Sequence, residues 1–459
     1  PLYRVVFSTT GAGIVSFELK KFRQTTDEKS PAVQLIDSLP APLLMAQSDS
    51  LPLGLPANAT YSVSHPALHL TKGSETLLFT YRTANGIIVN KLFTFHADRY
   101  DIGLDYRLQN NSSQPFTATL NTQLPVALGT QKGGKLQNTL AVSRHKEEFV
   151  TLKPKKIAAE SRRYSEQVSW GGFADKYFLT AFIGQNQSIS SLTFQKSPAS
   201  TTEKEVLVAT IQSPSFNLPA GSDTHLVYTL FAGPKETTIL KAVGSSLEQA
   251  LDLGWTSVIA RPLLWFLNYF YRFVHNYGLA IIILTVIIKL IFAPLTHKAQ
   301  VSMKAMQKLQ PKMTELREKF KNDREAMNRA IFELYRTHKV NPLGGCLPMV
   351  IQIPVFFALY SALMHAIELR HAPFFFWITD LSAADPYYIS PILMGATMFL
   401  QQKMSPSTLD PMQAQMFMML PLIFTIFCFI SPSGLVLYWL VNNILTIAQQ
   451  AYINKYVKA

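Results

Sequence analysis

The chain has 459 residues, of which 48% are hydrophobic and 15% are charged, and its formal net charge is +13. An ordinary soluble domain has roughly 25% charged residues, so this composition excludes a disordered chain and argues against one uniformly soluble domain. Residues 1–246 carry 24 basic and 18 acidic side chains, whereas residues 247–459 carry 18 and 11. Most basic residues of the second part lie in one stretch, as is typical of membrane spans separated by a cationic loop.

Residues 1–235 predict an all-β domain. Apolar and polar residues alternate in short segments such as 77–82, 87–95 and 100–108, and turn residues such as Gly86 bound these segments. A period of two without helical periodicity in between favours antiparallel strands in a sandwich or barrel.

This β domain carries no motif for nucleotide binding, zinc binding or nucleophilic catalysis. Its five histidines lack the spacing of metal ligands, so we expect no metal site and no cofactor. A run of basic residues at 153–163 is interpreted as a solvated loop, with contact to anionic lipid headgroups as the alternative.

Residues 236–274 predict a linker followed by an amphipathic helix. From Leu247 onward apolar and aromatic residues recur with helical spacing, and Arg261 and Arg272 lie among them. Such a helix is suited to a bilayer interface. We favour the interface over a core helix of the β domain, because the segment continues directly into an apolar stretch.

Residues 275–459 predict a helical membrane core. Between its first two apolar stretches, residues 297–341 carry eleven Lys and Arg, with apolar residues spaced three and four apart that predict a helical hairpin. The later loop 368–386 carries Arg370 beside three acidic residues. Five stretches have the length and hydropathy of transmembrane helices, at about 278–295, 343–367, 387–404, 412–430 and 434–451.

The distribution of basic residues predicts the orientation of the core. The positive-inside rule places the 297–341 hairpin, the 403–411 loop and the C-terminus in the cytoplasm, and the β domain on the outer side. An exported domain needs a targeting segment, and the sequence starts within a strand-like segment. We therefore expect an N-terminal anchor helix that this sequence does not include.

Several motifs of the core resemble those of the YidC membrane protein insertases, part of the YidC/Oxa/Alb superfamily. They lie at 341–348 with 352–360, at 380–388 and at 431–439. The opening segment 6–12 is similar to the start of the periplasmic domain of Gram-negative members. The resemblance implies a β-supersandwich periplasmic domain and a five-helix insertase core in the bacterial inner membrane.

The resemblance also implies the partners. We expect nascent membrane proteins as substrates, handled alone or together with the Sec translocon. The ribosome or the signal recognition machinery is expected at the cytoplasmic loops and the C-terminus, and anionic lipids at the basic surfaces. No nucleic acid substrate is expected.

Lys289 is the one charged residue of the first apolar stretch, eleven positions after Gly278 and hence about 16 Å along a helix. A cation at that depth costs roughly 2.5–3.5 kcal/mol on insertion scales. It either extends toward the cytoplasmic interface or lines a polar groove. Polar residues in the other spans favour a groove, for which we expect Lys289, Thr285, Gln352, Gln401, Tyr438, Asn442, Asn443 and Thr446.

We expect a non-enzymatic mechanism. The hydrophilic segment of a substrate is drawn from the cytoplasm toward Lys289, while its apolar segment moves into lipid, and burial of about 20 apolar residues supplies the free energy. The family usually has Arg at the matched position; Lys keeps the charge without the planar fork. The resemblance implies a sliding surface on spans 343–367 and 412–430, where the candidates are Met349, Ile353, Phe356, Met418, Leu422 and Phe427.

Alternatives remain open from the residues alone. Each sliding-surface candidate is explained as well by helix packing or lipid contact. A transporter or channel also places polar groups in the membrane, but usually shows internal repeats, and none is visible among the five stretches. A receptor whose outer β domain binds a ligand is the third candidate. An aqueous path through both faces would favour a transporter over an insertase.

Overall fold

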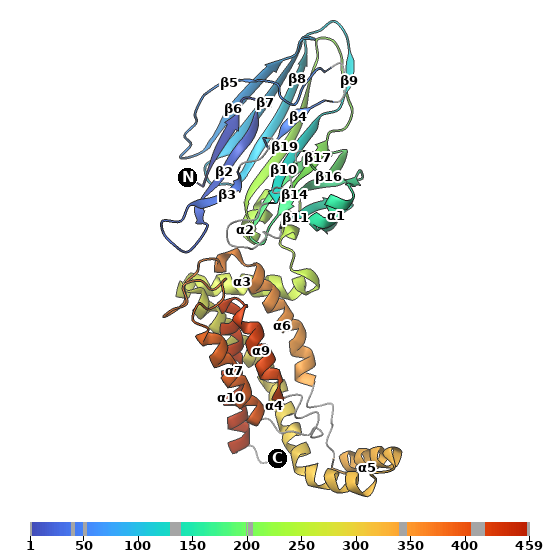
Figure 1. The fold of residues 1–459 in the computed structure, drawn as a ribbon, viewed down its shortest axis with the longest axis vertical. Coiled ribbons are helices and arrows are strands. Elements are labelled where there is room, and N and C mark those ends of the chain that lie inside the picture. Colours follow the sequence, from blue (N-terminus) through green and yellow to red (C-terminus); the bar gives the residue numbers. More distant parts are fainter. Residues whose placement is uncertain are drawn as a thin grey trace. The chain divides into compact units, whose positions relative to one another are not determined.

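The computed structural model describes residues 2–37, 42–48, 53–128, 139–198, 200, 205–338, 347–404 and 418–456. The chain divides into two compact units, Pro1–Leu251 and Asp252–Ala459 (Figure 1).

The first unit is built from antiparallel strands, which confirms the predicted all-β domain. The described strands form sheets of nine (β12-β11-β14-β15-β19-β8-β7-β6-β5), five (β13-β16-β17-β10-β4), three (β1-β2-β3) and two (β18-β9) members. Their bounds are β1 (Tyr3–Ser8), β2 (Gly13–Arg23), β3 (Ala32–Ile36), β4 (Met45–Gln47), β5 (Ser62–Val63), β6 (Ser74–Arg82), β7 (Ile87–His96), β8 (Asp101–Asn110), β9 (Phe116–Ala118), β10 (Asn121–Leu128), β11 (Leu140–His145), β12 (Glu148–Leu152), β13 (Arg162–Tyr164), β14 (Val168–Ala174), β15 (Phe178–Gly184), β16 (Ser191–Lys196), β17 (Glu205–Gln212), β18 (Phe216–Leu218) and β19 (Asp223–Pro234).

The alternating pattern explains the central strands of the large sheet. In β7 every second side chain is buried, and Gly86 takes a φ of 81° in the turn before it. The buried face carries Phe93, whose ring lies 4.8 Å from that of Phe7 on β1 and 5.8 Å from that of Phe79 on β6. The three-stranded sheet therefore packs on the nine-stranded sheet, and part of the core lies between them. The five-stranded sheet packs on the nine-stranded sheet too, since the ring of Phe194 on β16 lies 5.8 Å from that of Phe173 on β14.

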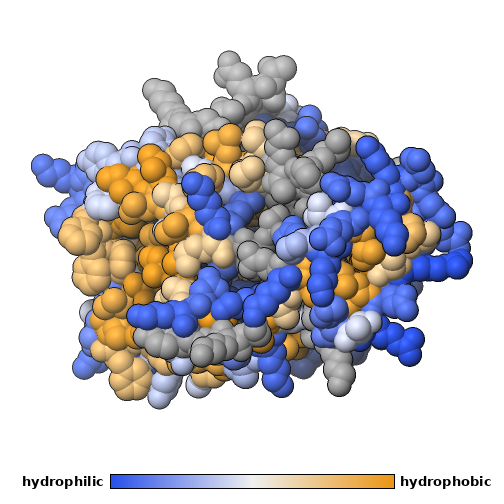
Figure 2. All heavy atoms as spheres, turned by 90° about the horizontal axis from the view of Figure 1, so that it is seen from below, coloured by the Kyte–Doolittle hydropathy of each residue, from blue (hydrophilic) through white to orange (hydrophobic). Residues whose placement is uncertain are grey.

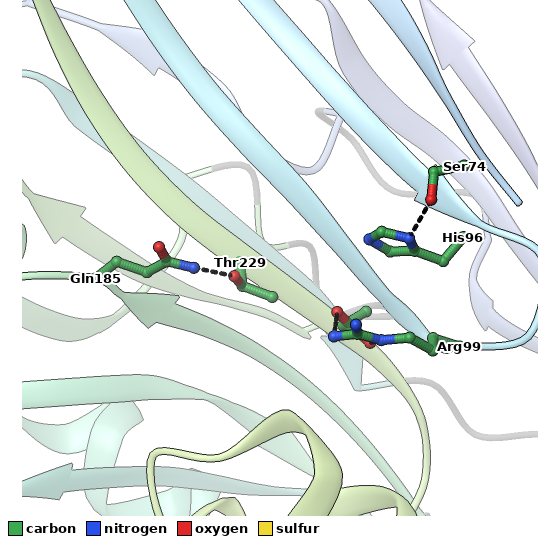
Figure 3. Close-up of polar contacts among 6 residues, drawn as sticks. Ser74, His96, Arg99, Gln185 and Thr229 are labelled. Atoms are coloured by element: carbon green, nitrogen blue, oxygen red, sulfur yellow. Dashed lines mark hydrogen bonds and ion pairs between the residues drawn. The ribbon is translucent and has the colours of Figure 1, made fainter.

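Polar side chains also pair across the large sheet, as Figure 3 shows. Ser74 Oγ and His96 Nδ1 are 2.8 Å apart on the paired strands β6 and β7. Gln185, just after β15, donates to the Thr229 hydroxyl of β19 at 3.0 Å. These pairs satisfy side chains outside the apolar core.

The basic side chains of 153–163 are exposed to solvent, as predicted, but the prediction of a loop is wrong. The segment contains the helix α1 (Pro154–Ala159) and the strand β13, which pairs with β16. Pro154 suits a first helical turn because its fixed φ is already helical. The buried side chain of Ile157 then anchors the helix to the domain.

The second unit is helical. Its helix α4 packs against α10 and α3, α7 packs against α10 and α9, and α3 also packs against α6. Seen from below, hydrophilic side chains gather on the right, where Figure 1 places α5, and apolar side chains cover much of the left (Figure 2). The helices are α3 (Ser257–Val274), α4 (Tyr277–Lys319), α5 (Arg324–Thr337), α6 (Leu347–His365), α7 (Ile389–Met404), α9 (Leu420–Phe429) and α10 (Ser433–Tyr456), with short 3₁₀ turns η2 (Gly254–Thr256) and η4 (Ile367–Leu369).

The predicted helical periodicity from Leu247 onward does not correspond to one continuous helix. The helix α2 (Thr237–Val243) and the 3₁₀ turns η1 (Leu247–Ala250) and η2 come first, and α3 starts at Ser257. Gly254 has a φ of 60°, a left-handed conformation that interrupts a helix. From there on α3 is amphipathic: one side is buried, and Trp265, Phe266, Tyr269 and Phe273 are exposed on the other.

The helix α4 runs far beyond the first predicted span, into the 297–341 region. It ends at Lys319, and Asp323 caps α5 by accepting from the backbone N–H groups of Glu325 and Ala326. Tyr277–Met306 is the one helix in the described part of the chain that is long and apolar enough to cross a bilayer; Val350–His365 and Leu420–Phe429 are shorter apolar helices. Residues 343–346 and 412–417 of two predicted spans lie outside the described residues, and the number of spans stays a prediction.

Candidate functional site

The polar site of the second unit begins on α4. The Asn276 side chain accepts from Leu279 N at 3.1 Å and so fixes the start of this helix. From there, Lys289 follows as the one charged side chain of an otherwise apolar stretch, and it is half-buried. The helix therefore carries a cation about 16 Å beyond Gly278.

Two side-chain oxygens of α10 receive the Lys289 ammonium. Nζ donates to Asn442 Oδ1 at 3.1 Å and to Thr446 Oγ1 at 2.7 Å. Asn442 and Thr446 are four residues apart and share one face of α10. The Thr446 hydroxyl donates its own proton to the Asn442 backbone carbonyl at 2.7 Å, which leaves its lone pairs for Lys289.

A third helix joins through Gln352 of α6. Its Nε2 lies 3.4 Å from Asn442 Oδ1, the oxygen that also accepts from Lys289. The Gln352 side chain also hydrogen-bonds Tyr438 of α10. Side chains from α4, α6 and α10 thus converge, and we call Lys289, Gln352, Tyr438, Asn442 and Thr446 the polar cluster.

The charge of Lys289 is balanced by no carboxylate within the described residues. Its two hydrogen-bond partners are neutral oxygens, and none of the ion pairs found there includes it. A cation taken out of bulk water and met only by neutral dipoles retains a strong attraction for an anion. The cluster is therefore an electropositive site between apolar helices.

Among the described residues, the hydrogen bonds of Lys289 do not include three of the expected groove residues. Thr285 is buried, and its hydroxyl donates to the Ile281 carbonyl of its own helix at 2.6 Å. Asn443 is buried one position after Asn442, which turns it about 100° away around α10. Gln401 lies near the end of α7 and is half-buried.

Polar contacts continue along the α4–α10 interface. Gln449 Nε2 donates to Thr296 Oγ1 at 2.8 Å, and Lys304 Nζ donates to the carbonyls of Ile453 and Asn454 at 3.3 and 3.2 Å. We call these contacts the polar seam. Sequence reasoning missed Thr296 and Lys304, although they follow Lys289 by seven and fifteen residues, a near-heptad spacing that keeps one face toward a partner helix.

The proposed sliding-surface residues lie on α6, on α9 and, for Met418, just before α9. Ile353, Leu422, Met418 and Phe427 are exposed, whereas Phe356 is half-buried and stacks on Trp439 of α10, with ring centroids 5.3 Å apart. Trp439 also contacts the rings of Phe424 and Phe427 on α9. Sequence reasoning did not single out Trp439, the residue that joins the two helices. Met349 lies in the first turn of α6, and its side chain is outside the described residues.

The β domain contains a cleft of about 1130 Å³ beside β1. Its lining includes His65 and His96, which lie within hydrogen-bond distance of Ser64 and Ser74. Neither unit has three or more His, Cys, Asp or Glu grouped to hold a metal ion among the residues described.

Comparison with known proteins gives matches to both units. Residues 1–266 match the YidC periplasmic domain, and residues 269–459 match the family described as 60Kd inner membrane protein. The membrane protein insertase YidC of Geobacter metallireducens is 48% identical over 462 residues, which covers 100% of this chain and 85% of the relative. That of Citrifermentans bemidjiense is 47% identical over 458 residues, or 99% and 84% of the two chains. A solved structure, an active YidC insertase with its first transmembrane domain resolved, is 18% identical with a TM-score of 0.43 and covers 100% of this chain and 91% of its own.

Proposed function

Since the chain belongs to the YidC family of membrane protein insertases, we propose that its polar cluster receives the hydrophilic segment of a nascent membrane protein. The family places it in the inner membrane with a periplasmic β domain. The observation that carries the mechanism is the Lys289 ammonium with two neutral oxygen partners, at 3.1 and 2.7 Å, inside an apolar helix pair.

Electrostatics set the direction of the first step. An acidic substrate segment that reaches the cluster replaces a solvated counter-ion for Lys289, so both charges gain a partner in a region of low dielectric. Asn442 and Thr446 hold the ammonium in place, and Gln352 offers a further donor beside it. Because a single ammonium lacks the fork of a guanidinium, the attraction depends on charge more than on bidentate geometry.

The apolar segment of the substrate follows the exposed surface of α6 and α9. Ile353, Met418, Leu422 and Phe427 are exposed there, and Met349 lies on the same helix as Ile353. Flexible Met side chains adapt to substrates of different shape. We propose that Trp439, packed against Phe356, keeps these two helices at a fixed separation during transfer.

Transfer needs no covalent chemistry in this proposal. The partition of about 20 apolar residues from water into lipid supplies the free energy, and the cluster lowers the barrier for the polar end. The chain thus works as an insertase and chaperone rather than as an enzyme.

The basic α4–α5 hairpin and the C-terminus are proposed to face the cytoplasm, in a multi-pass topology with the β domain outside. The eleven Lys and Arg of 297–341 support this orientation. That side would meet the ribosome or signal recognition machinery and anionic lipid, and the chain would act alone or beside the Sec translocon.

The test is insertion of a single-span substrate with an acidic translocated tail into vesicles that contain the full chain. Lys289→Glu is expected to lower insertion about tenfold, as a loss of about 1.4 kcal/mol of attraction would, whereas Lys289→Arg stays near the parent. Lys241→Glu is the matched control, since Lys241 is an exposed lysine outside the basic hairpin. Equal insertion by Lys289→Glu and the parent would refute the electrostatic step.

A further inference from the structure

The segment between α6 and α7, residues 366–388, combines exposed side chains with several that are fully buried. We call it the outer loop. Leu381 and Asp385 are 0% and 1% exposed, and Ile378 is 6% exposed. Connections normally run over the surface because their backbone groups need water, so a buried one needs its own hydrogen-bond partners.

Asp385 supplies those partners for the second half of the outer loop. Its carboxylate accepts from Trp377 Nε1 at 3.0 Å, Tyr387 N at 2.9 Å, Ser390 N at 2.8 Å and Ser390 Oγ at 2.6 Å. Although burial raises the pKa of Asp385, the bonds from Ser390, Trp377 and Tyr387 bring it below its ordinary value. The group is therefore an anion at neutral pH, fixed by donors of the loop and of the first turn of α7.

Backbone carbonyls of the same loop receive the first amides of α10. Gly434 N donates to Leu381 O at 2.9 Å, while Ser433 N and Oγ donate to Ala383 O at 2.7 and 2.8 Å. The first N–H groups of a helix have no partner within it. The outer loop thus caps α10, the helix that carries Asn442 and Thr446.

The loop also contacts α4 and α3. Phe374 packs so closely on Gly278, at the start of α4, that a Cβ there would lie 2.0 Å from its ring. Glu368 accepts from Asn268 of α3 at 3.0 Å. One loop therefore joins the starts of α4, α7 and α10 to α3.

Two of the three helices that build the polar cluster, α4 and α10, start against the outer loop. Lys289 lies about 16 Å along α4 from Gly278, and Asn442 about 12 Å along α10 from Gly434, at 1.5 Å per residue. We propose that Asp385 is a positioning residue that holds the outer loop as a fixed seal over the polar cluster. The polar cluster can then take up water and an acidic segment from the end of the helices opposite the outer loop, without forming an ion-conducting path. This inference rests on the proposed role of the cluster.

The experiment measures passive leak and insertion separately. Vesicles of phosphatidylethanolamine and phosphatidylglycerol containing the full chain are loaded with a chloride-sensitive dye and placed in a chloride gradient. The variant under test is Asp385→Asn. Its side-chain NH₂ group would face at least one N–H donor. The free energy of one hydrogen bond to a charged group is then lost, which is enough to raise the leak about tenfold. Asp252→Asn is the control: Asp252 is exposed, and Asn can still accept from Gly254 N.

The outcomes separate the two proposals. If Asp385→Asn leaks no more than the parent, the proposed seal is refuted. A lower thermal midpoint would not rescue the proposal, because a merely structural role of Asp385 would lower the midpoint without changing the leak. Lys289→Glu should insert poorly and stay tight; if it inserts normally, the electrostatic step fails while the leak result still stands. Should Asp385→Asn not fold, Trp377→Phe removes one of the four bonds and keeps a ring in place. About a threefold rise in leak is then expected. If Trp377→Phe leaks no more than the parent, the proposal is refuted.

Discussion

The ammonium of Lys289 on α4 lies 2.7 Å from the hydroxyl oxygen of Thr446 on α10, and this bond joins residues 157 positions apart in the sequence. The same hydroxyl donates to the Asn442 backbone carbonyl, so its rotation is fixed by its own helix. Thr446 is thus a preset acceptor: it holds the ammonium at one place while leaving part of its charge for a substrate.

Thr446→Val tests whether this placement matters. The change keeps the side-chain shape and removes the acceptor, and a hydrogen bond to a charged group contributes about 1.5–3 kcal/mol. We expect insertion of an acidic-tailed substrate to fall about tenfold, with a smaller effect on a neutral tail. Thr397→Val is the matched control, because the Thr397 hydroxyl bonds the Met394 carbonyl of its own helix. An equal effect of both variants would contradict the assignment.

A second prediction concerns the end of the polar seam. Lys304 donates to the last-turn carbonyls of α10, where a cation stabilises a helix by about 0.3–1 kcal/mol. Lys304→Met should therefore increase amide hydrogen exchange in the last turn of α10 about two- to fivefold. Lys298→Met, which removes an exposed Lys from the same helix, should leave that exchange unchanged. Unchanged exchange in Lys304→Met would show that the contact does not hold the helix end.

The sequence was most informative where burial itself is periodic. In β8 the apolar residues of the alternating segment 100–108, namely Ile102, Leu104, Tyr106 and Leu108, are all buried, because a strand in a two-layer fold must turn every second side chain to the core. The start of α3 could not be read in this way. The apolar spacing from Leu247 continues through two 3₁₀ turns, although the non-helical Leu251, with a ψ of 75°, and the left-handed Gly254 interrupt the helix.

The site was predictable as a set of polar residues, but the contacts between them were not. Polar side chains in apolar stretches pointed to Lys289 and Asn442, and these two meet. Thr285 stood out equally well, yet its hydroxyl bonds its own helix, as Thr commonly does. Which polar groups meet depends on helix packing, and the pattern within one helix does not contain that information. The five spans, their orientation and the site roles stay predictions.

Helix packing between α7 and α9 depends on one glycine. A Cβ at Gly395 would lie 2.1 Å from Thr425 Oγ1, and that hydroxyl is held by a 2.7 Å bond to the Pro421 carbonyl. A β-branched side chain has few alternative rotamers in a helix, so Gly395→Ala should destabilise the chain by about 1–3 kcal/mol. Thermal unfolding in detergent measures the loss.

The double variant Gly395→Ala with Thr425→Ala is the informative control. It removes the hydroxyl that the new methyl group would meet, so most of the lost stability should return, while Thr425→Ala alone should cost little. If the double variant is as unstable as the sum of the single changes, close approach of the two helices is not the cause.

Lys91 gives a prediction on pH dependence in the β domain. It lies on the inward face of β7 and is fully buried, and it donates to the carbonyls of Gly11 and Leu44 at 2.6 and 2.9 Å. Burial lowers the pKa of Lys91 to about 7, against about 10.4 in an unfolded chain. A neutral amine keeps two N–H groups, enough for the bonds to Gly11 and Leu44, so these two survive deprotonation. The longer bond to the Ala12 carbonyl, at 3.5 Å, is then lost.

The sign of the effect follows from the protons bound in each state. Between pH 7 and about 10 the unfolded chain holds a proton on Lys91 that the folded chain has released, so stability rises with pH by up to about 1.4 kcal/mol per unit. Below pH 7 both states are protonated, and this contribution is constant.

Lys91→Met should remove the rise of stability with pH. It should also lower stability at every pH, by about 1–3 kcal/mol for each carbonyl left without its donor. Both effects are measured by urea unfolding of the full chain from pH 6 to pH 9, with amide hydrogen exchange in β7 as the probe of unfolding. Lys72→Met, at an exposed position of the same unit, should show the same dependence of stability on pH as the parent. If Lys91→Met also shows the parent's pH dependence, the prediction is refuted.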